Sequence, residues 1–177
     1  MSTGGQHGLA GFGLAFLLAL PVGAQPRAVR LPGYQAALPF DSSAVVAALP
    51  AAAGAVFFAT RQVLFELGIP APIADSVGRY LVNGRLIKSR SLAGLPLSTY
   101  LNCGQGVTGP NADSFRVTMA VAAFMDSTGP MTSRLRVTLF AGAQSTEGVA
   151  KSAVACGSSG VLENRIIESV KLRVRPQ

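Results

Sequence analysis

The chain has 177 residues, a formal net charge of +7, two cysteines and no tryptophan. Its one histidine, His7, lies in a segment that we expect to be removed, so Ser-His-Asp catalysis, Cys-His catalysis and histidine-ligated haem lack their imidazole. Two cysteines and carboxylates alone make a poor zinc site, and we expect no metal and no cofactor.

The N-terminal segment has the pattern of an export signal. An apolar run over residues 9–20 is followed by a small-residue site at residues 22–24, which predicts a signal peptide over residues 1–24. Residues 1–8 contain no lysine or arginine, so retention of the segment as a membrane anchor is the alternative. The apolar run is short for a bilayer span, which needs about 20 residues. We therefore expect an exported protein of the periplasm or the extracellular face of the membrane.

Residues 25–42 are rich in proline and glycine and predict an extended arm or linker ahead of a single α+β domain over residues 43–177. Residues 43–49 predict a buried strand. Residues 51–67 predict a long helix that ends in a left-handed C-cap at Gly68. We interpret the uncharged stretch here as this strand and helix, not as a second membrane span, because Pro50 interrupts it.

A hairpin is predicted next, because Asn83 and Gly84 form the strongest short-range signal for a type I′ turn. Residues 152–156 predict a last strand. The segment that follows predicts a C-terminal helix, capped at Ser158 or Ser159, with apolar residues on one face.

Two longer strands, over residues 114–125 and 133–143, alternate apolar and polar side chains and are joined by a hairpin loop at residues 126–132. Val117 and Leu135 belong to the apolar faces. The alternation predicts a sheet with one covered and one solvated face. We therefore expect a twisted antiparallel sheet of about 4–6 strands, with both helices packed on one face.

The stretch “CGQGVTGPNAD”, residues 103–113, contains the spacing G-x-G-x-x-G at Gly104, Gly106 and Gly109. A dinucleotide-binding loop needs a helix that starts at the last glycine. Here Pro110 and then an alternating strand follow. We interpret the segment as a surface loop whose glycines and proline supply turn geometry.

Cys103 and Cys156 predict a disulfide, because an even pair in an exported protein is most simply a bridge. It would stabilise the fold by about 3–4 kcal/mol. Two separate free thiols are the alternative, although neither cysteine has a C-x-x-C partner that would lower its pKa.

We expect solvated roles for the acidic residues that could act in general acid–base catalysis: Asp75, Asp113, Glu147, Glu163 and Glu168. Only Glu163 and Glu168 come close in sequence, five residues apart on one predicted helix, and they are not well aligned on one face. Asp41 and Asp126 lie in predicted turns, where aspartate is common. We therefore expect no enzymatic activity.

Basic residues make the one candidate partner surface. Arg79, Arg85 and Lys88 would come from the predicted hairpin. If the two long strands are neighbours, a stripe would form on the uncovered face from Arg116, Arg134 and Arg136. Such a surface suits a flat acidic partner or a membrane surface; nucleic acid is not expected, because stacking rings are scarce. Charge that serves solubility alone is the alternative.

The segments “STYLNCG”, “GPNADSFRVTMAV” and “ACGSSGVLENRI” resemble a group of uncharacterised exported bacterial envelope proteins over about residues 43–170. The order of elements is also similar to the helix-grip domains of the outer-membrane assembly lipoprotein BamC, although the lipid-attachment cysteine is missing here. The resemblance implies an α+β fold and carries no catalytic residue with it.

We expect a non-enzymatic binding or structural protein, acting as a membrane-extrinsic accessory subunit that braces a larger envelope or membrane complex through its basic face and its proline-rich arm. A carboxylate-dependent hydrolase of envelope polymers and a carrier of small apolar ligands are the alternatives. The hydrolase requires two buried carboxylates about 5–10 Å apart in a cleft. The carrier requires a large closed apolar pocket.

Overall fold

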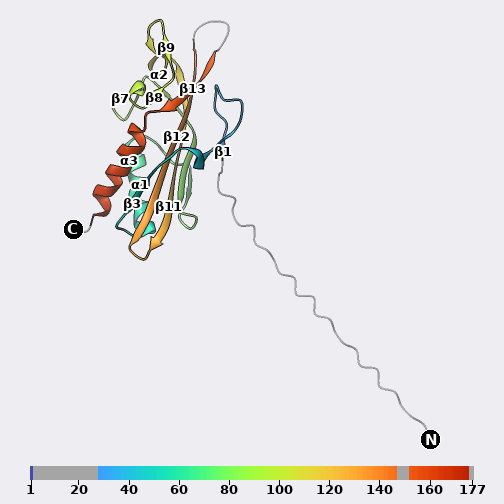
Figure 1. Ribbon diagram of the computed structural model, residues 1–177, viewed down its shortest axis with the longest axis vertical. Coiled ribbons are helices and arrows are strands. Elements are labelled where there is room, and N and C mark those ends of the chain that lie inside the picture. Colours follow the sequence, from blue (N-terminus) through green and yellow to red (C-terminus); the bar gives the residue numbers. More distant parts are fainter. Residues whose placement is uncertain (2–27, 147–151, 176–177) are drawn as a thin grey trace.

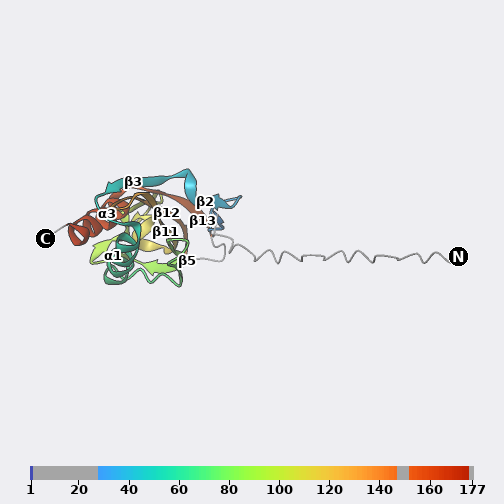
Figure 2. The ribbon, with the colours of Figure 1, turned by 90° about the horizontal axis from the view of Figure 1, so that it is seen from below.

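The computed structural model describes residue 1 and residues 28–146 and 152–175. The predicted signal peptide and its cleavage site lie outside these residues. The described chain forms three layers: two helices, a large antiparallel sheet, and an N-terminal arm on the sheet face opposite the helices (Figures 1 and 2).

The elements follow one another in a strand-rich α+β order. The strands are β1 (Ala28–Val29), β2 (Leu38–Pro39), β3 (Ala44–Leu49), β4 (Ile73–Asp75), β5 (Tyr80–Ser89), β6 (Ser91–Leu92), β7 (Leu95–Pro96), β8 (Leu101–Asn102), β9 (Gln105–Gly106), β10 (Gly109–Pro110), β11 (Arg116–Gly129), β12 (Thr132–Gln144) and β13 (Ala153–Ser158). The α-helices are α1 (Ala53–Glu66), α2 (Asn111–Ser114) and α3 (Val161–Val174), and short 3-10 turns cover Phe40–Ser42 and Leu97–Thr99.

The main sheet has seven strands in the order β4-β5-β11-β12-β13-β8, with β3 paired to the first half of β12. The prediction of 4–6 strands was therefore too low. β4 and β8 contribute three and two residues, too few for an alternation to be recognised in the sequence. The hairpin of β11 and β12 was predicted correctly, and it holds the sheet together over thirteen residue pairs.

Both long helices pack on one sheet face. Val56 and Leu64 of α1 meet Val117 and Leu135 of the sheet in the main core, and Ile166 of α3 joins them. α1 and α3 each have 14 residues, so the first long helix is no longer than the last. α1 begins at Ala53, two residues later than predicted. The predicted left-handed cap at Gly68 is confirmed by its φ of +71°.

The predicted turn at Asn83 and Gly84 is wrong, because both residues lie inside the continuous strand β5. Its pairing with β11 shifts register between Met119 and Val121, which leaves Gly84 and Arg85 opposite one residue of β11 as a β-bulge. Long-range pairing with β11 overrides the local turn preference.

The second sheet face is covered over its middle part, so the prediction of one solvated face was also wrong. Leu31 and Phe40 of the arm pack on Phe124 and Phe140 of the sheet in a second apolar cluster. The Tyr34 hydroxyl donates to the Cys156 carbonyl at 3.0 Å and fastens the arm to β13. Residues 28–42 are therefore a packed part of the fold and not a free linker.

Two further local predictions are corrected. The N-cap of α3 is Gly160, with a left-handed φ of +78°, and neither Ser158 nor Ser159 occupies that position. Asp126 lies in β11 and not in a turn, because the hairpin loop is tighter than predicted, with Gly129 paired to Thr132.

Candidate functional site

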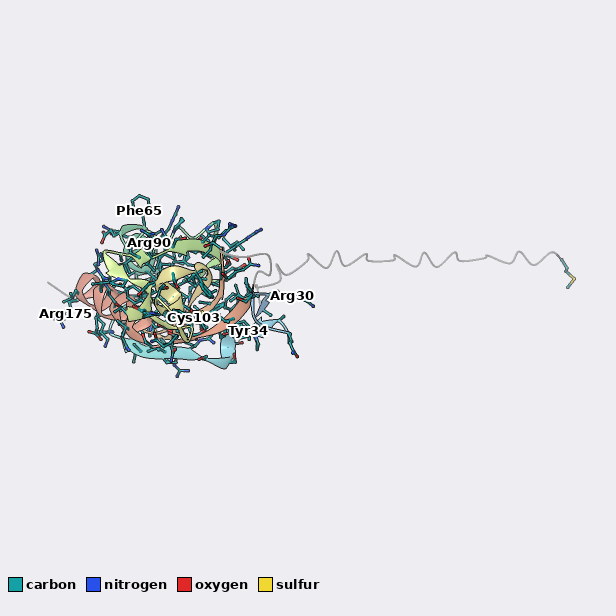
Figure 3. All side chains as sticks on the ribbon, turned by 90° about the horizontal axis from the view of Figure 1, so that it is seen from above. Arg30, Tyr34, Phe65, Arg90, Cys103 and Arg175 are labelled. Atoms are coloured by element: carbon teal, nitrogen blue, oxygen red, sulfur yellow. A yellow bond between two sulfur atoms is a disulfide. The ribbon has the colours of Figure 1, made fainter. Side chains whose placement is uncertain are left out.

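Three arginine side chains converge at one end of the arm-covered face. They surround a hollow of about 340 Å³, which we call the arginine pocket. The lining residues carry three positive charges and no negative charge: Arg30, Pro32, Gly84, Arg85, Ile87, Arg116, Thr118 and Gln144. Figure 3 places Arg30 beside Tyr34 on the arm side of the molecule, far from Arg175 at the end of α3.

The β-bulge positions Arg85. The buried Asn83 side chain accepts a hydrogen bond from the Arg85 N–H at 3.0 Å and donates to the Pro70 carbonyl at 2.6 Å. The bulge is thereby tied to the loop that follows α1. On the pocket side, Ile87 lies opposite Thr118, and both line the hollow.

Arg116 and Arg30 come from different parts of the chain. Arg116 is the first residue of β11 and pairs with Gln144 at the end of β12, so both side chains share the arm face. Arg30 is carried by the arm, which crosses β12 at Gly142. A side chain at residue 142 would overlap the Pro32 carbonyl oxygen, so this close crossing requires glycine.

The pocket arginines have no ion-pair partner among residues 28–146 and 152–175. Every described carboxylate is held by another group. These groups are Arg136 for Asp41 and Asp126, Arg173 for Glu66, Lys171 for Glu168, Ser98 for Asp113, Ser158 for Glu163, and the Val77 and Gly78 N–H groups for Asp75. Within the part of the chain that the structure describes, no carboxylate neutralises the pocket, and its positive charge can attract an anion.

The predicted stripe of Arg116, Arg134 and Arg136 does not form. Arg134 lies opposite Asp126, ten positions along β12 from Gln144, which corresponds to roughly 30 Å. The two strands are neighbours as expected, but antiparallel pairing puts Arg116 at one end of the hairpin and the other two arginines at the opposite end.

The environment of Arg136 also differs from the prediction. Its guanidinium group pairs with Asp126 at 3.0 Å and Asp41 at 2.8 Å and lies 5.3 Å from the ring centre of Phe124. These contacts fasten the 3-10 turn before β3, and the second half of β11, to β12. Arg136 is therefore a structural residue whose charge is already balanced.

Arg79 and Lys88 lie away from the pocket. Arg79 has a φ of +54° in the turn before β5, and its carbonyl accepts the Met125 N–H. Lys88 pairs with Val117 and shares the helix-side face, with its ammonium group near Gly68. Of the six predicted basic residues, only Arg85 and Arg116 line the pocket, and Arg30 was missed because it lies in the predicted extended arm or linker.

The predicted disulfide is confirmed. Cys103 and Cys156 are bonded, both are buried, and the bridge joins the loop after β8 to β13. A buried disulfide indicates a protein outside the cytoplasm, where thiols are kept reduced. Along residues 28–146 and 152–175, none of the helices has the length and apolar character needed to span a membrane.

The glycine-rich segment is built around Asn111. The Asn111 amide donates to the Cys103 carbonyl at 3.1 Å, and a Cβ at Gly106 would lie 2.7 Å from the Asn111 oxygen. A helix does follow the last glycine, contrary to expectation, but α2 covers only Asn111–Ser114. The segment acts as a folded turn beside the disulfide, and its glycines allow close approach to Asn111.

The predicted solvated role of Glu163 is wrong, because its side chain is buried. It is 2% exposed, and burial raises the pKa of its carboxyl group, an effect that the hydrogen bond from Ser158 at 2.7 Å partly offsets. Its second oxygen has no hydrogen-bond partner among the described residues. A signal was present in the spacing, because Glu163 precedes Ile166 and Ile167 by three and four residues on the inner face of α3.

The remaining acidic residues have structural partners. The pKa of the Asp75 carboxyl group is lowered, mainly by the hydrogen bond from the Gly78 N–H and also by the one from the Val77 N–H. Among the described residues, Asp41 and Asp126 are the one pair of carboxylates that shares a partner, Arg136, and both of their side chains are exposed. Within the described residues, no three histidine, cysteine or acidic side chains gather as metal ligands would. Glu147 lies outside those residues.

The chain was compared with protein-family models, curated proteins and solved structures. No family model, no curated protein and no solved structure matches this chain. The similarity to exported envelope proteins and to helix-grip domains therefore stays an expectation from the sequence, and the candidate site rests on its own geometry.

Proposed function

We propose that the protein is a non-enzymatic binding subunit of the cell envelope, in the periplasm or on the outer face of the membrane, that holds an acidic surface of a protein partner in the arginine pocket. The observation that carries this proposal is the convergence of Arg30, Arg85 and Arg116 around a hollow that contains no negative charge. A partner carboxylate would replace water around these guanidinium groups and form charge-assisted, bidentate hydrogen bonds.

The disulfide supports the envelope location, and the rigid mounting of the pocket supports a binding role. One wall is a strand of the central sheet, and another is an arm fastened by Tyr34 and by the Thr138 hydroxyl, which donates to the Phe40 carbonyl at 2.8 Å. A preorganised site loses less entropy when a partner binds. This arrangement suits a subunit that braces a larger complex.

The two alternatives receive less support from the described residues. A hydrolase needs buried carboxylates in a cleft, but Asp41 and Asp126 are exposed and held by Arg136. A carrier needs an open apolar interior, but the space between helices and sheet is occupied by fully buried side chains such as Leu64, Met119 and Leu162.

Site-specific photo-crosslinking in cells tests the proposal. A photoreactive residue at Ile87, which is 43% exposed on the pocket wall, should crosslink to one defined envelope protein. The matched position is Met131, which is 68% exposed at the far end of the β11–β12 hairpin and should give no such product. The crosslink should be lost when Arg85→Gln and Arg116→Gln are combined.

Arg134→Gln is the control variant, because Arg134 is exposed and forms no ion pair with any residue that the structure describes. It should leave the crosslink at position 87 intact. Thermal unfolding of the variants checks that each is folded. Absence of any protein adduct at position 87, or equal loss with Arg134→Gln, would contradict the proposal.

A further inference from the structure

The strand that carries Arg85 has a free edge beside the pocket. β11 pairs with one side of β5 along its length, but β4 pairs with the other side only at Tyr80–Val82. Beyond that point, residues 84–89 make no second strand pairing among the described residues. An unpaired strand edge is a template for another extended chain.

The charges at this edge have one sign. Arg85, Lys88 and Arg90 follow one another along the strand and its end, with no acidic residue between them. Ile87 lies among them, half exposed, and faces the pocket side. Basic side chains on an edge strand repel a second copy of the same edge and attract an acidic strand.

The side-chain period of a strand connects the edge to the pocket. A chain added to β5 would point every second side chain to the arm face, where Arg30, Arg85 and Arg116 lie. Acidic residues at alternate positions would then enter the pocket, and the residues between them would face the helix side near Lys88. Main-chain hydrogen bonds would supply affinity and the arginines would supply specificity.

We propose that the partner contributes an extended acidic segment, with carboxylates at alternate positions, that adds as a strand to the free edge of β5 and places those carboxylates in the arginine pocket. This inference rests on the proposed function and specifies how the acidic partner is recognised. It names a peptide segment as the occupant, in place of a flat acidic surface.

The test uses a fluorescent synthetic peptide of alternating threonine and glutamate residues and the purified full-length chain. The peptide should bind with an affinity that falls as salt rises, because the contacts are charge-assisted. Arg85→Gln and Arg116→Gln should each weaken it about tenfold or more. Arg134→Gln should leave the affinity unchanged. Hydrogen exchange of amides in residues 84–89 should slow when the peptide binds.

A second peptide separates strand addition from simple charge attraction. N-methylation of alternate residues, on the edge that would pair with β5, removes the main-chain donors and keeps every carboxylate. This peptide should lose most of the binding. Equal binding of both peptides, or no change in exchange at residues 84–89, would overturn strand addition while leaving pocket binding in place.

Failure of the peptide-binding test can be told apart from failure of the crosslinking test of the proposed function. If the crosslink at position 87 depends on Arg85 and Arg116 but neither peptide binds, the acidic-strand inference fails and the binding subunit stands. If the peptide binds equally to Arg134→Gln and to the pocket variants, the attraction is diffuse and the inference also fails.

Discussion

Gly142 and Pro32 touch backbone to backbone where the arm crosses β12. Any Cβ at residue 142 would overlap the Pro32 carbonyl oxygen, so Gly142→Ala must lift the arm from the sheet. The lifted arm would expose the apolar cluster around Phe40 and would move Arg30 out of the pocket. We expect a loss of unfolding free energy of about 3 kcal/mol, at the upper end for overpacking, and faster proteolysis of residues 28–42.

Chemical denaturation and limited proteolysis check this prediction. Gly157→Ala is the matched control, because Gly157 lies on neighbouring β13 and a Cβ there would have nothing within 4 Å. It should be nearly neutral. An arm that stays protected in Gly142→Ala would show that the crossing is not needed for its packing.

Replacing both cysteines by alanine should lower the unfolding free energy by about 4 kcal/mol, the chain-entropy value for a loop closed across a sequence separation of 53. Urea denaturation with and without a reductant measures this loss. Reductant should destabilise the native chain and leave the double variant unchanged. A native chain that is insensitive to reductant under denaturing conditions would argue against the bridge.

Glu163 makes stability depend on pH in a direction opposite to that of most carboxylates. Burial raises its pKa in the folded state, so the folded protein binds more protons than the unfolded protein between the two pKa values. The free energy of unfolding should therefore fall as the pH rises from about 4.5 through the raised pKa. Glu163→Gln should remove this fall and stabilise the protein at neutral pH.

Unfolding free energies measured from pH 4 to pH 8 on both proteins test this sign. Glu168→Gln serves as the control, because Glu168 is exposed and paired with Lys171, and should keep the native pH profile. A native profile that rises over this range, or one unaltered by Glu163→Gln, would show that Glu163 is not the group responsible.

Asn83→Ala should destabilise the bulge, because it removes the donor to the Pro70 carbonyl and the acceptor for the Arg85 N–H. The expected loss of unfolding free energy is about 1–3 kcal/mol, typical when buried hydrogen-bond partners are removed. Binding of the acidic peptide should weaken as well, because Arg85 loses its fixed position.

The control for this change is Asn164→Ala. Asn164 donates to the Gly160 carbonyl at 2.9 Å on an exposed part of α3. Asn164→Ala should therefore lower the unfolding free energy less than Asn83→Ala does, and it should leave peptide binding unchanged. Equal effects of both substitutions on the affinity for the peptide would contradict a positioning role for Asn83.

Elements whose signals are local or strongly periodic were predicted well. The alternation of Val117 and Leu135 with polar residues identified the central hairpin, and Gly68 identified the end of α1. The signal at Asn83 failed because a preference for a turn, worth little by itself, is overridden by pairing along the whole of β11. The spacing of Glu163 to Ile167 places it on the inner face of α3, but a charged side chain favours exposure, and the prediction of exposure was wrong.

By itself, the sequence determined which residues can be buried in the sheet and α3, the pairing of its two cysteines, and an excess of positive charge. The tertiary structure decided which arginines meet. Arg30, Arg85 and Arg116 come from an arm, a bulge and a strand end, and only strand register and the crossing at Gly142 bring them together. Register depends on contacts between residues far apart in the chain, which no local pattern specifies.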